Sequence, residues 1–235
     1  MRQRRGRRSA TRWCALPTAW AGSVPPGRSH RYAPVRARGE EGSRAATCVV
    51  DVTKAEDLQR LVSTTIDQYG RLDVLVNNAS IAPISPLADL DTEGWSAMID
   101  VNLRGMLNGV AAALPVFREQ GSGHLVSIVS VAGLYGVSPT MAVYAATKNA
   151  VRTVHEGLRT ESTDGVVRTT AISPGYIRTD LADSMAEPHI REQTRQAMDA
   201  VGIPPSAVAR TVAFAVEQPA DVEIGEISVR PTVQA

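Results

Sequence analysis

The sequence predicts an α/β fold with a doubly wound parallel sheet, and two observations predict it. From residue 45 onward, apolar runs of strand length alternate with longer stretches of helical pattern, an alternation that places helices on both faces of a parallel sheet. In addition, 43% of the 235 residues are hydrophobic, enough to form the core of one such domain. We therefore expect a single domain over residues 45–235, preceded by a segment of different character over residues 1–44.

The N-terminal half of this domain should contain two strands around a helix, followed by a long helical region. Residues 45–50 form an apolar run that predicts a strand, and residues 54–69 form a helical stretch that ends at Gly70. The mostly apolar run 72–76 is typical of a buried parallel strand. A helical region over residues 92–120 follows, and the Gly-Ser-Gly sequence after it predicts a break.

The C-terminal half continues the alternation. Residues 124–131 and 166–172 are expected to be buried strands, with a helix over residues 142–162 between them. After a Pro-Gly loop, two polar helices are expected before Pro219, and residues 224–229 can close the sheet.

Residues 1–44 have a different composition from the rest of the chain. Residues 1–39 hold ten Arg and no acidic residue, which leaves 15 basic and 24 acidic side chains elsewhere. No apolar spacing of period 2 or 3.6 runs through this Arg-, Pro- and Trp-rich segment, so we expect no strand or helix in it. Three interpretations compete: a disordered basic arm for nucleic acid or an acidic surface, an Arg-rich transit peptide, and a stretch whose reading frame or start site was assigned wrongly. We favour the third.

Composition also argues against several classes of protein. No run approaches the roughly 18 apolar residues that a membrane-spanning helix needs. Cys14 and Cys48 have neither the number of a disulfide framework nor metal-ligand spacing, which favours a reducing cytoplasm, and we expect Cys48 in the core. The four histidines show no ligand spacing, so we expect no metal site.

Two side chains with acid–base chemistry lie on the helix expected over residues 142–162. Tyr144 and Lys148 are four residues apart, so they project from one face, one turn apart. A phenol has an ordinary pKa about three units above neutral pH, and a nearby ammonium favours the phenolate. Ser130 ends the preceding strand, where parallel sheets bind ligands, and its hydroxyl can orient a substrate oxygen. Each feature alone also fits a surface helix or an ordinary turn, but their relative positions favour a site.

Ser130, Tyr144 and Lys148, with Asn102 upstream, resemble the catalytic tetrad of the short-chain dehydrogenase/reductase family. The resemblance covers about residues 45–235 and implies a Rossmann-like fold and hydride transfer between a nicotinamide cofactor and a small carbonyl or secondary alcohol. It also implies the roles. Tyr144 would exchange the proton with the substrate oxygen, which Ser130 would hold. Lys148 would bind the nicotinamide ribose and lower the pKa of the tyrosine, and Asn102 would support a water in the proton relay.

Three further segments resemble cofactor-binding motifs of that family. Residues 51–53 (Asp-Val-Thr) resemble its adenine-contacting turn, and residues 77–80 (Asn-Asn-Ala-Ser) resemble its Asn-Asn-Ala-Gly motif, with Ser80 in place of Gly. Residues 174–179 resemble the segment that engages the nicotinamide carboxamide. The cofactor-binding residues that the resemblance implies are Asp51, Val52, Asn77, Ala79, Tyr144, Lys148, Pro174, Ile177 and Thr179.

The N-terminus departs from the family. Its first strand, glycine-rich turn, first helix and second strand have no counterpart before Ala45, so we expect the fold to be incomplete there, with an unpaired sheet edge. We also expect weak cofactor binding or none, because the pyrophosphate loses its backbone donors. Residues 226–234 resemble a subgroup of NADP-dependent reductases that includes 3-hydroxy-acid and clavulaldehyde dehydrogenases, which favours NADP over NAD.

The resemblance also implies partners. The helical regions 92–120 and 142–162 resemble those of the family's subunit interface, so a homodimer or homotetramer is expected. The alternative function is a catalytically silent binding or regulatory protein of the same fold that uses a basic N-terminal arm. The arm has no lysine, repeat or nucleic-acid motif, so we expect neither a nucleic-acid partner nor a membrane partner.

Overall fold

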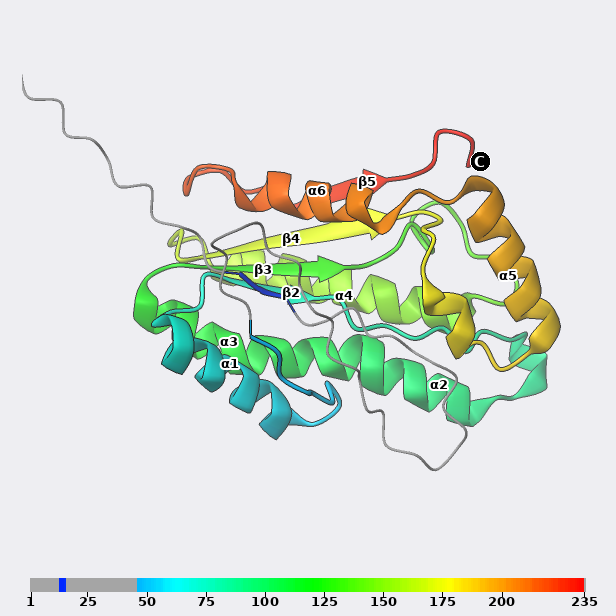
Figure 1. Ribbon diagram of the computed structural model, residues 1–235, viewed down its shortest axis with the longest axis horizontal. Helices are drawn as coiled ribbons and strands as arrows, with labels where there is room; N and C mark the ends of the chain where they lie inside the picture. Colours follow the sequence, from blue (N-terminus) through cyan, green and yellow to red (C-terminus); the bar gives the residue numbers. More distant parts are fainter. Residues whose placement is uncertain (1–12, 16–45, 235) are drawn as a thin grey trace, which may run out of the picture.

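The computed structural model describes residues 13–15 and 46–234. Its sheet has five parallel strands in the order β1-β2-β3-β4-β5 (Figure 1). The strands are β1 (Trp13–Ala15), β2 (Val74–Asn77), β3 (Gly123–Ile128), β4 (Val167–Pro174) and β5 (Glu226–Val229). Since every pair is parallel, the carboxyl ends of all strands meet at one edge of the sheet, the edge at which such folds bind ligands.

Helices cover both faces of the sheet, which confirms the doubly wound α/β class. The α-helices are α1 (Ala55–Tyr69), α2 (Thr92–Met98), α3 (Gly105–Gln120), α4 (Ala142–Glu161), α5 (Pro188–Val201) and α6 (Pro205–Val216), joined by the 3-10 helices η1 (Leu87–Asp89) and η3 (Asp180–Ser184) and the π-helical η2 (Ile99–Arg104). Figure 1 shows α1, α3 and α4 on one face and α6 on the other. Leu75 and Leu125 accordingly share a core with Phe117 of α3, whereas Val126 packs with Val212 of α6.

Strand β1 corrects one expectation about residues 1–44, because it lies in a segment where no element was expected. Its three residues pair in parallel with Val74–Val76 of β2, on the side away from β3. Three residues are too few to show a periodicity, yet an extended backbone of that length can satisfy the hydrogen-bonding groups of a neighbouring strand. Strand β2 is therefore an internal strand. The other residues of segment 1–44, and with them its three interpretations, lie outside the described residues.

The elements expected from residue 54 onward are confirmed, with ends that differ by at most three residues. Gly70 ends α1 in the left-handed conformation, with a φ of 81°. One expectation about composition is wrong: α6 is not polar throughout, because Val208, Val212 and Val216 pack against the sheet.

The strand expected over residues 45–50 is also wrong. Residues 46–50 have no regular secondary structure, because no described strand lies beside them to complete a ladder. Val50 is still buried, but Val49 is 55% exposed. Cys48 is only partly buried and packs at the margin of the main core, so its expected place within the core is not confirmed.

The long helix expected over residues 92–120 is continuous but changes its winding in the middle. Asp91 caps it, with Oδ1 accepting a 2.9 Å hydrogen bond from the Gly94 N–H. The central segment η2 is π-helical, a winding that often marks functional sites. Asn102 lies in this segment and is buried.

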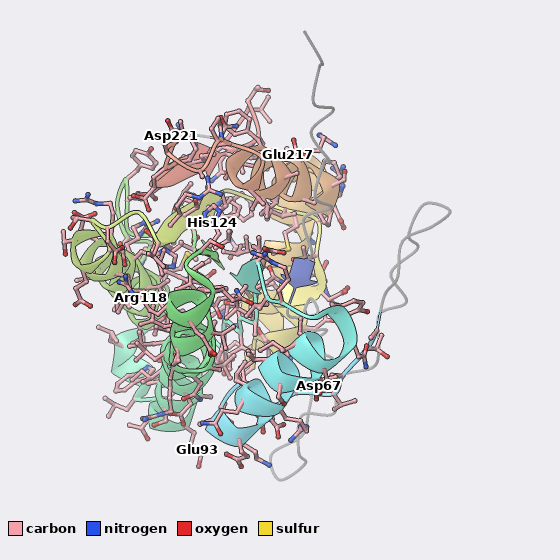
Figure 2. All side chains as sticks on the ribbon, turned by 90° about the vertical axis from the view of Figure 1, so that its left-hand side faces the viewer. Asp67, Glu93, Arg118, His124, Glu217 and Asp221 are labelled. Atoms are coloured by element: carbon pink, nitrogen blue, oxygen red, sulfur yellow. The ribbon has the colours of Figure 1, made fainter. Side chains whose placement is uncertain are left out.

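Asp67, Arg118, Glu217 and Asp221 lie at the outside of the molecule, whereas His124 is buried (Figure 2). Among the described helices, none combines the length and apolar character that crossing a membrane requires.

A glycine at the start of β3 allows α3 to pack closely against the sheet. A Cβ on Gly123 would lie 2.0 Å from Cγ of Phe117, a side chain with 0% exposure. We expect Gly123→Ala to lower the free energy of unfolding by about 1–3 kcal/mol, because the ring has to move within a packed core. Urea denaturation measures this change.

Gly157→Ala is the matched control. A Cβ there would meet nothing within 4 Å, and the residue lies in the interior of α4. We expect this variant to gain about 0.5–1 kcal/mol, because alanine loses less backbone entropy in a helix. Equal stabilities for the two variants would contradict the packing argument.

Candidate active site

Tyr144 and Lys148 lie one turn apart on α4 and are both buried, with exposed fractions of 5% and 3%. The Lys148 Nζ lies 5.6 Å from the centroid of the Tyr144 ring and donates a 3.0 Å hydrogen bond to the Ile128 carbonyl at the end of β3. The surrounding sequence is rich in alanine and therefore helical. The pairing expected from the spacing is thus present in the structure, against the end of a central strand.

Burial moves the pKa of both groups toward the neutral form. The pKa of Lys148 falls to about 7 because burial disfavours the ammonium and Arg152 repels it. The pKa of Tyr144 is raised because burial disfavours the phenolate, while the nearby hydroxyls of Ser130 and Ser80 and the charge of Arg152 oppose only part of that effect. The net shift in the pKa of Tyr144 is upward, and the expected lowering by Lys148 in a cofactor-bound site stays a prediction. Tyr144 is a phenol at neutral pH and can donate a proton.

Ser130 lies just beyond β3, which ends at Ile128, two residues before it. Its Oγ accepts a 3.0 Å hydrogen bond from the Ala132 N–H, and its hydroxyl is close enough to the phenol of Tyr144 to affect the pKa of that group. The hydroxyl of Ser80 approaches the same phenol, and its Oγ has no hydrogen-bond partner among the described residues. Both hydroxyls therefore lie close enough to the phenol to lower its pKa.

Asn102 forms hydrogen bonds with the backbone of Ile81, the residue after Ser80. Its Oδ1 accepts from the Ile81 N–H and its Nδ2 donates to the Ile81 carbonyl, both at 2.9 Å. Nδ2 also lies 3.3 Å from Oγ1 of Thr147, the residue before Lys148. The side chain of Asn102 is thus fully used in joining η2, the segment after β2, and α4.

A recess beside Lys148 brings together several residues expected to bind the cofactor. It is lined by Val52, Asn77, Ala79, Val101, Asn102, Gly105, Met106, Ser127, Ile128, Lys148 and Val151. Asn77 donates from Nδ2 to the Ser127 hydroxyl at 3.5 Å, whereas its buried Oδ1 has no hydrogen-bond partner among the described residues. This unpaired acceptor lies against Gly109 of α3.

The turn at residues 51–53 is held by its own hydrogen bonds. Asp51 Oδ1 accepts from the N–H and the hydroxyl of Thr53, at 3.0 and 2.7 Å. The Val52 carbonyl accepts a 2.9 Å hydrogen bond from Nδ2 of Asn108 on α3, a residue that the sequence did not single out. Asp51 is therefore a structural residue of this turn, whatever else it binds.

The segment at residues 174–179 begins beside the segment that carries Ser130. Pro174 ends β4, and its carbonyl accepts a 3.0 Å hydrogen bond from Val131, next to Ser130. Ile177 forms a bridge with Ile203, and Thr179 is exposed at the start of η3. In the described part of the chain, no hydrogen bond joins this segment to Tyr144 or Lys148.

The nicotinamide end of a cofactor fits the residues present. An ammonium has three donors, and the Lys148 Nζ uses one of them on Ile128, which leaves two for ribose hydroxyls. The pyrophosphate end fits less well. The first turn of α1 carries Glu56 and Asp57, whose charge repels phosphate, and no glycine-rich turn follows β1 in the sequence.

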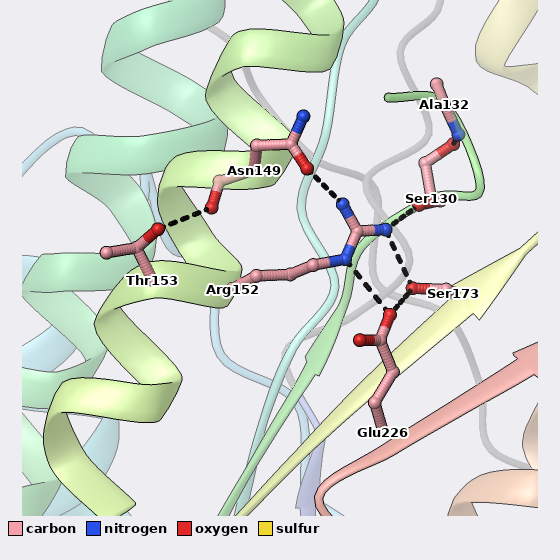
Figure 3. A network of polar contacts seen from close by, with 7 residues as sticks. All are labelled: Ser130, Ala132, Asn149, Arg152, Thr153, Ser173 and Glu226. Carbon is pink, nitrogen blue, oxygen red and sulfur yellow. Dashed lines mark hydrogen bonds and ion pairs between the residues drawn. The ribbon is translucent and has the colours of Figure 1, made fainter. Parts of the chain in front are cut away.

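Sequence reasoning did not find Arg152, which binds Ser130, Ser173 and Glu226 (Figure 3). Two signals could have found it. It lies four residues after Lys148, on the same helix face, and Glu226 supplies an opposite charge in the last strand.

Comparison with known proteins gives consistent results. A family model described as short chain dehydrogenase matches residues 28–189. An uncharacterized oxidoreductase of Listeria monocytogenes is 44% identical over 186 residues, which cover 78% of this chain and 75% of the relative. One of Staphylococcus saprophyticus is 39% identical over 187 residues, 79% of this chain and 75% of the relative.

Solved structures are similar as well. The closed form of serine dehydrogenase complexed with NADP+ has a TM-score of 0.72 and 29% identity, over 79% of this chain and 75% of that one. An alcohol dehydrogenase from the archaeon Thermococcus sibiricus, complexed with 5-hydroxy-NADP, has a TM-score of 0.67 and 25% identity, over 79% and 74% of the two chains.

Proposed function

The chain belongs to the short-chain dehydrogenase family and is an NAD(P)-dependent oxidoreductase, and we propose that it uses NADP(H) to interconvert a small carbonyl compound and the corresponding secondary alcohol. The observation that carries this proposal is the buried pair of Tyr144 and Lys148, with the hydroxyl of Ser130 beside the phenol. The nicotinamide cofactor, when bound, supplies or accepts the hydride.

The side chains of this site perform the proton transfer. In reduction, Tyr144, which is protonated at neutral pH, donates its phenolic proton to the substrate oxygen. The Ser130 hydroxyl donates a hydrogen bond to the same oxygen. Lys148 binds the nicotinamide ribose, and its pKa of about 7 allows it to take up or release a proton near neutral pH. Asn102 keeps η2 and α4 in register around that lysine.

The residues that we propose for cofactor binding divide between two places. Val52, Asn77, Ala79 and Lys148 line or reach one recess. Pro174 ends β4, and Ile177 and Thr179 follow it at the same carboxyl edge of the sheet. We assign all three to the nicotinamide. We assign Asp51 and Val52 to the adenine. NADP is favoured over NAD because two similar structures hold NADP or an NADP derivative.

We expect the purified chain to bind NADPH more weakly than micromolar. The nicotinamide ribose has its lysine, but no glycine-rich turn supplies amides to the pyrophosphate. Titration of the protein into NADPH, followed by cofactor fluorescence, measures the dissociation constant. Reduced nicotinamide mononucleotide is the matched control: it lacks the adenylate half, so its affinity should be close to that of NADPH.

Tight NADPH binding, at low micromolar concentration, would overturn the expected weakness without affecting the proposed reaction. The reaction is tested by NADPH oxidation at millimolar cofactor with a panel of small aldehydes, ketones and oxo acids. Turnover of at least one of them is expected. If none is reduced, the alternative remains, a silent binding protein of this fold. The intact proton-donating pair weighs against that alternative, since a silent protein has no use for it.

We also propose a homodimer or homotetramer in the cytoplasm. Ile99 of η2 and Leu107 of α3 are each 42% exposed, on the helical region expected to meet a second subunit. Burying such apolar side chains stabilises association. The location rests on the cysteine content of the sequence.

A further inference from the structure

The guanidinium of Arg152 lies where four segments of the chain meet (Figure 3). Its Nε is 3.0 Å from Oε1 of Glu226 on β5, and one terminal nitrogen is 2.9 Å from Oγ of Ser173 on β4. That nitrogen also donates to the carbonyl of Ser130, and the other donates to Oδ1 of Asn149 on α4. The side chain of Arg152 is only 13% exposed. One cation therefore joins α4, β4, β5 and the segment after β3.

Glu226 is the acceptor to which two donors of this network point. The Ser173 hydroxyl donates a 2.6 Å hydrogen bond to the same Glu226 oxygen that accepts from Arg152. The carboxylate thus holds both donors in place. A guanidinium presents five donors in a planar fork, which suits several acceptors at fixed angles. An ammonium at the same position could not reach all of them.

These contacts restrict the backbone of Ser130. The N–H groups on both sides of it, from Val129 and Val131, bond to the carbonyls of Ile172 and Pro174 at 2.7 and 3.0 Å. Arg152 then holds the carbonyl of Ser130 itself. With these three bonds made, the backbone of Ser130 has little freedom, and this sets the direction of its Cα–Cβ bond. The hydrogen bond from the Ala132 N–H then holds Oγ.

We propose that Arg152 is a positioning residue of the reductase site: it holds the Ser130 backbone so that the hydroxyl faces the phenol of Tyr144, and Glu226 and Ser173 hold Arg152 in turn. The inference rests on the proposed function for the meaning of that geometry. Arg152 itself touches neither the phenol nor the reacting atoms.

The charge of Arg152 supports this role. It lowers the pKa of Lys148 and opposes the raised pKa of Tyr144. Charged groups on the neighbouring elements are otherwise occupied. Asp100 and Arg104 of η2 pair with each other at the surface.

Other groups near the network act on it less. Arg168 on β4 donates to carbonyls of residues 216–222. Glu93 on α2 is exposed. His155, three residues after Arg152, is neutral because burial lowers its pKa to about 4, and the charge of Glu226 opposes only part of that shift. Glu226 thus remains the carboxylate that balances Arg152.

Arg152→Met tests the proposal by a readout that needs no cofactor. The chain contains only two lysines, Lys54 and Lys148, so a lysine-selective ¹³C label gives two side-chain NMR signals. We expect the titration of Lys148 to move to higher pH in Arg152→Met, because a nearby positive charge is lost. The Lys54 signal is the internal reference. Arg152→Lys keeps the charge and should leave the Lys148 titration close to that of the wild type.

Steady-state kinetics distinguishes the positioning role of Arg152 from the effect of its charge. We expect kcat for carbonyl reduction to fall about tenfold or more in Arg152→Met, with the KM for NADPH unchanged, because the Ser130 hydroxyl acts on the transition state. Arg152→Lys should recover only part of kcat. Arg159→Met is the matched control: Arg159 lies on the same helix and pairs with Glu156 at the surface, so no change is expected.

An unchanged Lys148 titration in Arg152→Met, together with a kcat equal to that of Arg159→Met, would overturn the proposal.

If Arg152→Met does not fold, Glu226→Gln decides, since it keeps an oxygen acceptor and removes the balancing charge. The Lys148 titration should then move to lower pH, and no movement would count against the proposal. A wild-type protein without turnover would refute the proposed function, while the titrations would still test Arg152.

Discussion

Replacing Tyr144 by Phe should lower kcat for carbonyl reduction by about 10²–10⁴-fold, the range that general acid catalysis contributes. The variant removes one oxygen atom from a buried side chain and leaves its ring against Lys148. Tyr144 is the proton donor that we propose for the substrate oxygen, because its raised pKa means that the phenol is protonated at neutral pH. Initial rates of NADPH oxidation at saturating substrate measure the effect.

The fold and the cofactor affinity should not change with this substitution. The variant keeps the buried ring and loses only its hydroxyl oxygen, so the urea midpoint is expected to stay near that of the wild type. Tyr69→Phe is the matched control, since Tyr69 ends α1 and takes no part in the proposed site. A Tyr144→Phe variant with wild-type kcat would refute the assignment of the proton donor.

Acidification from pH 7.5 to 5 should cost about 4 kcal/mol of unfolding free energy, about 2 kcal/mol for each of two buried histidines. Burial lowers the pKa of His124 to about 3 and that of His155 to about 4. Each ring makes one hydrogen bond, His124 to Thr170 at 2.8 Å and His155 to Ser127 at 2.7 Å. Neither Nδ1 has a hydrogen-bond partner among the described residues.

The sign follows from where the protons bind. Above pH 6.5 both rings are neutral in the folded and the unfolded chain, and the stability is fully present. As the pH falls from 6.5 toward the folded values of about 3 and 4, the unfolded chain binds protons that the folded chain excludes. Stability is therefore lost progressively over that window.

Urea denaturation at pH 7.5, 6 and 5 measures this loss. His155→Gln, which can still donate a hydrogen bond to Ser127, should lose only about half as much stability over the same interval. His189→Gln, on an exposed side chain, is the control and should behave like the wild type. A free energy of unfolding that does not vary between pH 7.5 and 5 would show that these two rings titrate normally in the folded chain.

The order of the elements from residue 54 onward could be predicted from the sequence because it depends on local patterns. Apolar runs, helical stretches and a terminal glycine such as Gly70 act over a few residues. The same holds for Tyr144 and Lys148, whose common face follows from a spacing of four on a helix. The family could be recognised because these motifs stand in the right order along the chain.

What the sequence could not decide depends on which remote segments become neighbours. Residues 46–50 look like a strand but pair with no strand among the described residues, whereas Trp13–Ala15 pairs with β2 without any local signal. The raised pKa of Tyr144 is a consequence of burial, which no spacing reveals.

For the Tyr144 site, the sequence by itself therefore determined the chemical groups and their order, since covalent spacing and helical periodicity are local. Only the tertiary structure decided the protonation of these groups and the contacts that hold them in place. Their pKa values shift because the packed core removes them from water. Arg152 donates a hydrogen bond to Ser130, which is 22 positions away in the chain, and pairs with Glu226, which is 74 positions away.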